Sequence, residues 1–224
     1  MIKFIKTIIF VFSCIFTSYS VAETYLGATR VVISDGKNEG STSIHNKDKL
    51  NYLIQSWVLD ENDQETNDIV ITPPLFKLEG NTSSSIRVVM VGEPPADRES
   101  LYWLNVKFIP STDKNLKINK LTFAVNNRIK IIYRPKSLSF TDPVDIFKKV
   151  SIRYVDGKIE FKNPTKYFIN ISEVKVNDDV LKTPSYIKPE SSEFILLKNN
   201  KKPSTVNYAF IDDLGKLNLF KADL

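Results

Sequence analysis

Three basic residues close together in one apolar segment are the first candidates for chemistry. Arg128, Lys130 and Arg134 lie within NNRIKIIYRP (126–135), among isoleucines and a tyrosine. Arginine and lysine bind carboxylates and phosphates, and a cleft between domains would favour such a contact. A strand whose basic residues face water has the same pattern. From the pattern alone we favour this simpler interpretation.

Residues suited to catalysis or metal binding are scarce. His45, in STSIHNKD, is the only histidine, and we expect a solvated histidine in a loop or at a strand end. The sequence has no G-x-S-x-G nucleophile elbow and no glycine-rich phosphate loop. The acidic segment 59–68 does not have the spacing of an EF-hand and is predicted to be a hairpin turn. The sequence therefore predicts a non-enzyme without metal or cofactor.

The first 22 residues have the pattern of a signal peptide. Lys3 and Lys6 precede an apolar run from Ile8 to Phe16, and Ser20-Val21-Ala22 supplies small residues for cleavage. The run is short for a membrane span, so we expect export and cleavage, with a retained anchor as the alternative. Cys14, the only cysteine, lies in this leader, so the mature chain is predicted to contain no disulfide.

The mature chain is predicted to form two domains. Removing Lys3 and Lys6 lowers the formal charge from +5 to +3, which does not indicate binding to nucleic acid. About 200 residues suit two ordinary domains. Arg134 to Pro143 carries two prolines among polar residues and is the expected break. The predicted units are 1–22 as leader, 23–138 as the first domain and 139–224 as the second.

Alternating apolar and polar residues predict strands throughout both domains. Twelve segments, short and rich in Val, Ile, Phe and Tyr, are separated by turn residues, and no helix is predicted beyond the leader. Two sets of such strands are typical of two antiparallel, immunoglobulin-like β-sandwiches. The fold class is therefore all-β, and Trp57 and Trp103 are expected to be large anchors of the first core.

The longest of these segments has two interpretations. In KLTFAVNNRIKIIY (120–133), Leu121, Phe123 and Val125 alternate with smaller or polar residues. An ordinary core strand explains the pattern most simply. If the strand lies at a sheet edge, however, its unpaired N–H and C=O groups would pair with another chain. The pattern alone leaves both possibilities open.

One segment resembles the signature of a known family. PADRESLYWLNVKFIPS (95–111) is similar to the signature of periplasmic pilus-assembly chaperones, which act in chaperone–usher systems. The matching residues are Asp97-Arg98-Glu99-Ser100, Trp103, Asn105 and Ile109-Pro110. Further blocks resemble the family in the same order along the chain: YLIQSWV, ITPPLFKLE, NNRIKIIYRP, FKNPTKYFINIS and YAFIDDLGKLN.

The resemblance implies a fold and a set of functional residues. It implies two immunoglobulin-like domains joined at an angle with a cleft between them. Arg30 and Lys130 match the basic pair that holds the C-terminal carboxylate of a pilus subunit. Leu121, Phe123 and Val125 match the donor strand, which completes the unfinished fold of the subunit. The subunit and an outer-membrane usher are the implied partners, and the periplasm is the implied compartment.

The resemblance leaves the facing of Lys130 open. Lys130 comes five residues after Val125, so in a regular strand the two side chains would point to opposite faces. Either a bulge near Asn126-Asn127 changes the facing, or the cleft approaches the strand from its other side.

The resemblance also implies an ionic network between the domains. Its members match Glu99, Arg134 and Asp213, although the neighbouring Asp212 could take the last position. Separate surface ion pairs, each contributing at most about 1 kcal/mol, are the alternative. PSTDKN (110–115) is a modest connector, which indicates the short-loop group of the family.

A structural subunit or adhesin of a surface appendage is the competing function. Such a protein would carry a donor-type N-terminal extension, but only ETYLGA precedes the first predicted strand. The exposed donor strand could also self-associate. We expect no nucleic-acid partner and no membrane insertion.

Overall fold

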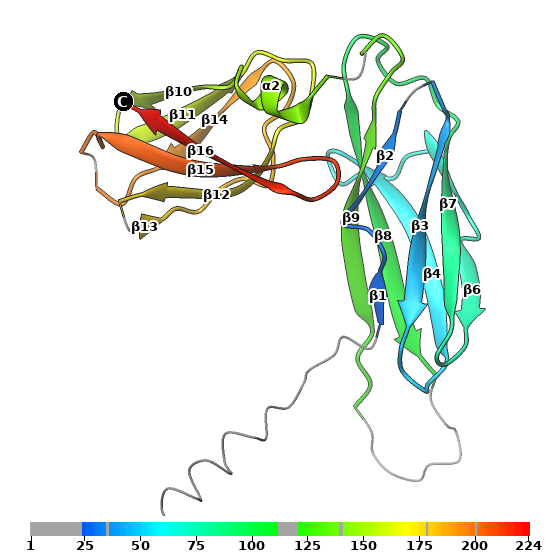
Figure 1. Cartoon of the computed structure of the whole chain (residues 1–224). Coiled ribbons are helices and arrows are strands. Elements are labelled where there is room, and N and C mark those ends of the chain that lie inside the picture. Colours follow the sequence, from blue (N-terminus) through cyan, green and yellow to red (C-terminus); the bar gives the residue numbers. More distant parts are fainter. Residues whose placement is uncertain (1–23, 35, 112–120, 139–140, 178, 200) are drawn as a thin grey trace, which may run out of the picture.

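The alternating segments form β-sheets, as the sequence predicts. The computed structural model describes residues 24–34, 36–111, 121–138, 141–177, 179–199 and 201–224. In these ranges the chain folds into sixteen strands and one short helix. The strands make two β-sandwiches that stand at an angle to one another (Figure 1). The prediction of an all-β fold with two immunoglobulin-like domains is confirmed. The leader and Cys14 lie outside the described residues.

The first sandwich contains two sheets packed around one apolar core. One sheet has the order β1 (Thr24–Leu26), β3 (Glu39–Asn46), β7 (Ser83–Met90), β5 (Ile69–Thr72). The other has the order β2 (Arg30–Ile33), β9 (Val125–Tyr133), β8 (Ser100–Pro110), β4 (Tyr52–Asp60), β6 (Leu75–Leu78). Alternate residues of both sheets face inward, and Ile33, Ile44, Ile86, Leu104 and Ile131 are fully buried in the core.

Two of the places where the chain crosses from one sheet of this sandwich to the other contain glycine or proline. Between β1 and β2 the crossing passes Gly27, whose backbone N–H donates to Ser43 O at 2.8 Å. A Cβ at position 27 would lie 1.9 Å from Ser43 Oγ, so a larger residue would force the serine side chain to move. The second crossing is at Pro73-Pro74, between β5 and β6, where a proline cannot continue the ladder.

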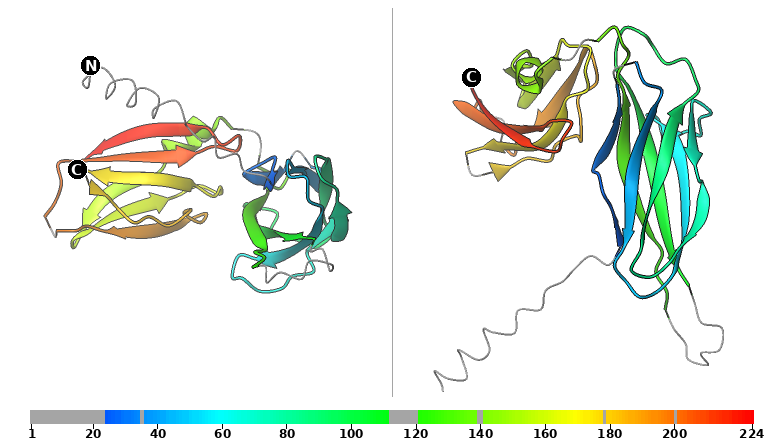
Figure 2. Two further views of the ribbon diagram at one scale, coloured as in Figure 1. Left: turned by 90° about the horizontal axis from the view of Figure 1, so that it is seen from below. Right: turned by 45° about the vertical axis from the view of Figure 1, so that its right-hand side comes forward.

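The second sandwich also contains two sheets. One has the order β10 (Ser151–Val155), β11 (Lys158–Asn163), β14 (Ser191–Leu196). The other has the order β13 (Asp179–Val180), β12 (Asn170–Val176), β15 (Thr205–Ile211), β16 (Leu217–Asp223). Asp156 and Gly157, with φ of 44° and 80°, make a two-residue turn between β10 and β11. Figure 2 shows both sandwiches from below and from the side.

The strand prediction is wrong in two ways. DIVITPPLFKL (68–78) is one of the twelve segments predicted as single strands, but it forms β5 and β6 because its two prolines divide it. The structure adds β1, β3 and the two-residue β13, which the sequence analysis did not predict. In β3 only Ile44 is a large buried apolar residue, and buried Thr42 and Asn46 take the other inward positions. A polar strand of this kind lacks the alternation on which the prediction rested.

The prediction that no helix follows the leader is also wrong, because the second domain contains one. The helix α2 (Pro143–Phe147) is one turn long and buries Ile146 and Phe147. Its N-cap is Asp142, whose Oδ1 accepts from Val144 N at 2.8 Å, and Pro143 occupies the first turn. The aspartate–proline pair was interpreted as a linker signal, although it is equally typical of a helix start.

The expectation that Trp57 and Trp103 anchor the first core is wrong. Both side chains are only partly buried, and neither belongs to the core. The inward residues of β8 include Tyr102 and Leu104, which flank Trp103, so Trp103 lies on the outer face of the sheet. Its ring centroid is 6.2 Å from that of Tyr186 in the second domain. The aromatic side chain therefore belongs to the junction between domains.

Candidate functional site

Arg30 and Lys130 lie side by side on one face of the first domain. β2 runs parallel to β9, and in the register of this pair Arg30 is opposite Lys130. Val31 and Ile131, the next residues along each strand, point into the core. Both cations therefore point out of the sandwich, from the face that the second domain approaches.

The second domain makes direct contacts with Lys130. Its Nζ donates to Asn170 Oδ1 at 2.7 Å and to the backbone oxygen of Ser185 at 2.9 Å. The rings of Tyr186 and Trp103 lie 5.1 and 5.9 Å from the ammonium, within the range of cation–π attraction. Burial, followed by the nearby charge of Arg30, lowers the pKa of Lys130 to about 8.

Arg30 is a partly buried cation whose donors are incompletely used. Its Nε and Nη1 are buried and have no hydrogen-bond partner within the described residues. Burial lowers the pKa of Arg30, and Asp213 and Asp212 oppose this effect through space. A buried donor without an acceptor is costly, so this pair of cations favours an incoming anion.

The facing of Lys130 follows from the regular register of β9. Residues 125–133 pair with 108–100 of β8 without a shift, so there is no bulge at Asn126-Asn127. Val125 and Ile129 are on the inward side, and Lys130 is on the outward side. The second alternative therefore holds: the cleft lies on the face of β9 opposite to the face of Val125.

Arg134 connects Glu99 and Asp213 across the domain junction. Its Nε lies 2.6 Å from Glu99 Oε1, and its Nη1 lies 2.8 Å from Asp213 Oδ2. Glu99 Oε2 also accepts from the backbone N–H of Phe168 in the second domain, at 2.7 Å. The structure thus brings together the three residues that the family resemblance implied for the ionic network.

Burial shifts the pKa values of this network. It raises the pKa of Glu99 to about 7, although Arg134 and the N–H of Phe168 oppose the shift. Burial also tends to lower the pKa of Arg134, but Glu99 and Asp213 together raise it above its ordinary value. Only 13% of the Arg134 side chain and 1% of the Glu99 side chain are exposed, so water screens the pair weakly.

Asp212 and Asp213 have different partners. Asp212 Oδ1 accepts from the backbone N–H groups of Leu214 and Lys216, at 3.0 and 2.9 Å, and so caps the turn between β15 and β16. Asp213 is the residue that contacts Arg134.

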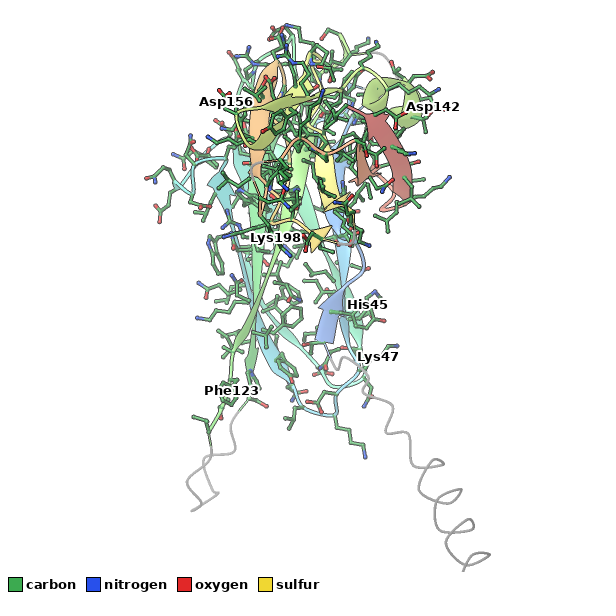
Figure 3. All side chains as sticks on the ribbon, turned by 90° about the vertical axis from the view of Figure 1, so that its left-hand side faces the viewer. His45, Lys47, Phe123, Asp142, Asp156 and Lys198 are labelled. Carbon is green, nitrogen blue, oxygen red and sulfur yellow. The ribbon has the colours of Figure 1, made fainter. Side chains whose placement is uncertain are left out.

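The predicted donor residues are exposed at the end of β9 that lies away from the second domain. The exposed fractions of Leu121, Phe123 and Val125 are 77%, 72% and 53%. Only Val125 belongs to the strand, which is shorter than the predicted 120–133; Lys120 lies outside the described residues. Figure 3 shows Phe123 at the lower end of the first domain.

The start of β9 also has an open edge. Residues 125–133 pair with β8 on one side, but β2 pairs only with residues 130–133 on the other. Among the described residues, no strand therefore pairs with this second edge at 125–129. The segment 110–115, used to predict the short-loop group, lies largely outside the described residues.

The junction residues around Lys130 were not predicted from the sequence. Asn170, Ser185 and Tyr186 belong to the second domain and carry no charge that would mark them. Burial, followed by the nearby Glu61, raises the pKa of Tyr186 to about 12. The alternation along β8 could have indicated the outward position of Trp103, because Trp103 lies between two inward residues of the strand.

The other candidates for chemistry are held by local contacts. His45 lies near the end of β3, with Nδ1 2.8 Å from Ser83 Oγ and its ring stacked on Tyr25. It is partly buried, whereas a solvated side chain was expected.

In the acidic turn, Asp60 Oδ1 accepts from the backbone N–H groups of Asn62 and Gln64. Within the described ranges, no three His, Cys, Asp or Glu residues are grouped as a metal would require.

Two family models match consecutive parts of the chain. The N-terminal domain of PapD, described as a pili and flagellar-assembly chaperone, matches residues 23–139. The C-terminal domain of the pili assembly chaperone PapD matches residues 145–219. The chain belongs to the PapD family of pilus-assembly chaperones. These matches cover both sandwiches and confirm the resemblance inferred from the signature segment.

Individual relatives agree with this assignment. The chaperone protein FocC of Escherichia coli is 34% identical over 202 residues, which are 88% of this chain and 88% of the relative. The chaperone protein FimC of E. coli K12 is 34% identical over 196 residues, which are 86% of this chain and 80% of the relative. The family contains assembly chaperones, so the chaperone function is favoured over a structural subunit or adhesin.

Solved structures share the fold along nearly the whole chain. The E. coli chaperone DraB has a TM-score of 0.78 and 34% identity, covering 90% of this chain and 98% of DraB. A chain from the Salmonella enterica complex of the SafA pilin with the SafB chaperone has a TM-score of 0.82 and 26% identity. That match covers 92% of this chain and 99% of the other. No helix in the described part of this chain is long and apolar enough to cross a membrane.

Proposed function

We propose that this chain is a periplasmic chaperone that captures pilus subunits and delivers them to an outer-membrane usher. The observation that carries the proposal is the outward-facing pair Arg30 and Lys130, with two buried donor atoms of Arg30 left without a partner in the described residues. Two adjacent cations in a shielded place suit a carboxylate, because charge-assisted contacts are strongest there. The C-terminal carboxylate of a subunit supplies such an anion.

Donor-strand complementation is the second part of the proposed mechanism. Leu121, Phe123 and Val125 would enter the groove of a subunit that lacks its last strand, and the open edge of β9 would pair with it. Their exposure in the free chain supports this role. The likeness to a structure that contains a pilin and its chaperone supports a pilus subunit as the partner.

The network of Glu99, Arg134 and Asp213 would brace the two domains in this mechanism. It ties the end of β9 to the second domain, while the start of β9 stays open for the subunit. We place the domain boundary between residues 138 and 139. A rigid junction would keep the carboxylate site and the donor strand at a fixed separation, which reduces the entropy lost on binding.

Export completes the proposal. The leader 1–22 would be cleaved, and the mature chain would work in the periplasm as a non-enzyme without metal or cofactor. Final folding of the subunit would drive its release, so no nucleotide is required. Nucleic acid and membrane insertion play no part. The exposed donor strand of a free chaperone could pair with a second copy.

Co-purification of subunits with a tagged chain tests the proposal. The tagged chain is purified from the periplasm of cells that produce pilus subunits, and mass spectrometry identifies the bound proteins. Lys130→Ala should remove the subunits while the chaperone stays folded. Arg128→Ala is the matched control: Arg128 is on the same strand and face but is already paired with Asp63, so it should retain them. Equal recovery with Lys130→Ala would contradict the carboxylate anchor.

A further inference from the structure

Asn170 reaches the carboxylate site from the second domain on a fixed backbone. It is the first residue of β12, and only 3% of it is exposed. The residue before it, Ile169, exchanges two backbone hydrogen bonds with Ile187, at 3.0 and 2.8 Å. This bridge places Asn170 beside the 185–187 segment, and both segments contact Lys130.

The two contacts from the second domain use two of the three donors of Lys130. A lysine ammonium donates three hydrogen bonds and accepts none. Asn170 Oδ1 and Ser185 O accept two of them, so one remains for a ligand. Because Oδ1 faces the ammonium, the amide Nδ2 of Asn170 is a further donor beside the site. The ammonium is thereby fixed in direction before the anion arrives.

The neutrality of Asn170 is the decisive chemical property. An aspartate has the same shape but would place a carboxylate beside Lys130 and would act as a permanent internal competitor. The nearby acids act on Arg30 only through space, because Asp213 pairs with Arg134 and Asp212 caps its own turn. Within the described residues, no carboxylate is hydrogen-bonded to Arg30 or Lys130.

We infer that Asn170 is a positioning residue of the carboxylate site, which orients the Lys130 ammonium and, being neutral, leaves the charge of both cations to the C-terminus of the subunit. The inference rests on the proposed function, since it concerns the same site. It adds that specificity for a free C-terminal carboxylate depends on the second domain as well as on the first.

A pair of short peptides tests the inference without an identified subunit. The probe is an acetylated pentapeptide of alternating valine and threonine with a free C-terminal carboxylate, compared with the same peptide as an amide. Calorimetry gives the ratio of the two affinities. A charge-assisted contact predicts a preference of about tenfold or more for the free carboxylate in the mature wild-type chaperone.

The variants at position 170 should reduce this preference in a set order. Asn170→Ala should lower it several-fold, because the ammonium loses its orientation. Asn170→Asp should abolish it, although aspartate is closest to asparagine in size. A residue that only supports the fold would give the opposite order, with alanine the more damaging change. Asn207→Asp is the matched control, because it adds the same charge to an exposed position of β15 in the same sheet, and it should keep the preference.

The possible results separate this inference from the proposed function. The role of Asn170 is overturned if Asn170→Ala keeps the wild-type preference for the free carboxylate. It is also overturned if Asn170→Asp loses less of this preference than Asn170→Ala does. If Asn170→Asp fails to unfold cooperatively on heating, Asn170→Ala alone decides. If the wild-type chain itself shows no preference, or Lys130→Ala keeps it, the carboxylate anchor of the proposed function fails instead.

Discussion

Lys130 of the first domain donates a hydrogen bond to Asn170 of the second, with 2.7 Å between Nζ and Oδ1. Lys130 is also the register partner of Arg30 in the neighbouring parallel strand. One side chain therefore links the proposed anion site to the domain junction. Reorienting the second domain would change the environment of Lys130, so the domain angle and the carboxylate site are physically coupled.

Charged substitutions in the donor segment should abolish subunit capture without affecting folding. Phe123→Asp is expected to lose subunits in co-purification, because a carboxylate cannot enter an apolar groove. Since Phe123 is 72% exposed, the free energy of unfolding should change by no more than about 0.5 kcal/mol.

The control for this segment is an equally exposed apolar residue elsewhere. Leu219 in β16 is 80% exposed, and Leu219→Asp should keep the bound subunits. If both variants bind subunits equally well, the segment 121–125 is not the donor.

Removing Glu99 should destabilise the junction strongly. Glu99→Ala leaves the guanidinium of Arg134 poorly paired in a place of low exposure and removes the acceptor of the Phe168 N–H. The loss of one partner from such a pair predicts a fall of about 3 kcal/mol in the free energy of unfolding, measured with denaturant.

An exposed ion pair provides the comparison. Glu79 and Lys77 are 3.2 Å apart, with side chains 68% and 60% exposed, so Glu79→Ala should cost less than about 1 kcal/mol. Similar losses for the two variants would show that Glu99 does not brace the junction.

Much of this fold could be predicted from the period-two pattern, and the exceptions have physical causes. Leu104, Val106 and Phe108 alternate with more polar residues and lie in the core as expected. β3 was missed because its buried positions include Thr42 and Asn46, which do not look apolar. Trp103 was wrongly predicted to lie in the core, because its size was given more weight than its outward position in the alternation of β8.

The candidate site was only partly accessible to sequence reasoning. Arg30, Lys130 and Arg134 were found through their charge and the family resemblance. Asn170 was missed because it is an uncharged residue forty positions from Lys130, and only the packing of two domains brings them together. The facing of Lys130 required the actual register of β8 and β9, since a single bulge would have reversed it.

Binding of a subunit should weaken as the pH rises through about 8. Burial and Arg30 lower the pKa of Lys130 to about 8, so the ammonium is charged below this pH and loses its proton above it. The subunit carboxylate stays ionised throughout and favours the charged lysine. This linkage predicts about a tenfold loss of affinity between pH 7 and pH 9.

Lys130→Arg is the matched variant for the pH measurement. A guanidinium does not lose its proton in this range, so the variant should bind with little dependence on pH. A flat profile for the wild-type chaperone, or the same slope in both proteins, would rule out the titration of Lys130 as the cause.

The central claim is that Arg30 and Lys130 hold the C-terminal carboxylate of a pilus subunit. The most direct test is calorimetry with one purified subunit in two forms, with its native C-terminus and with that terminus amidated. Two charge-assisted contacts predict that amidation weakens binding by about a hundredfold or more. Equal affinity for the two forms would contradict the account.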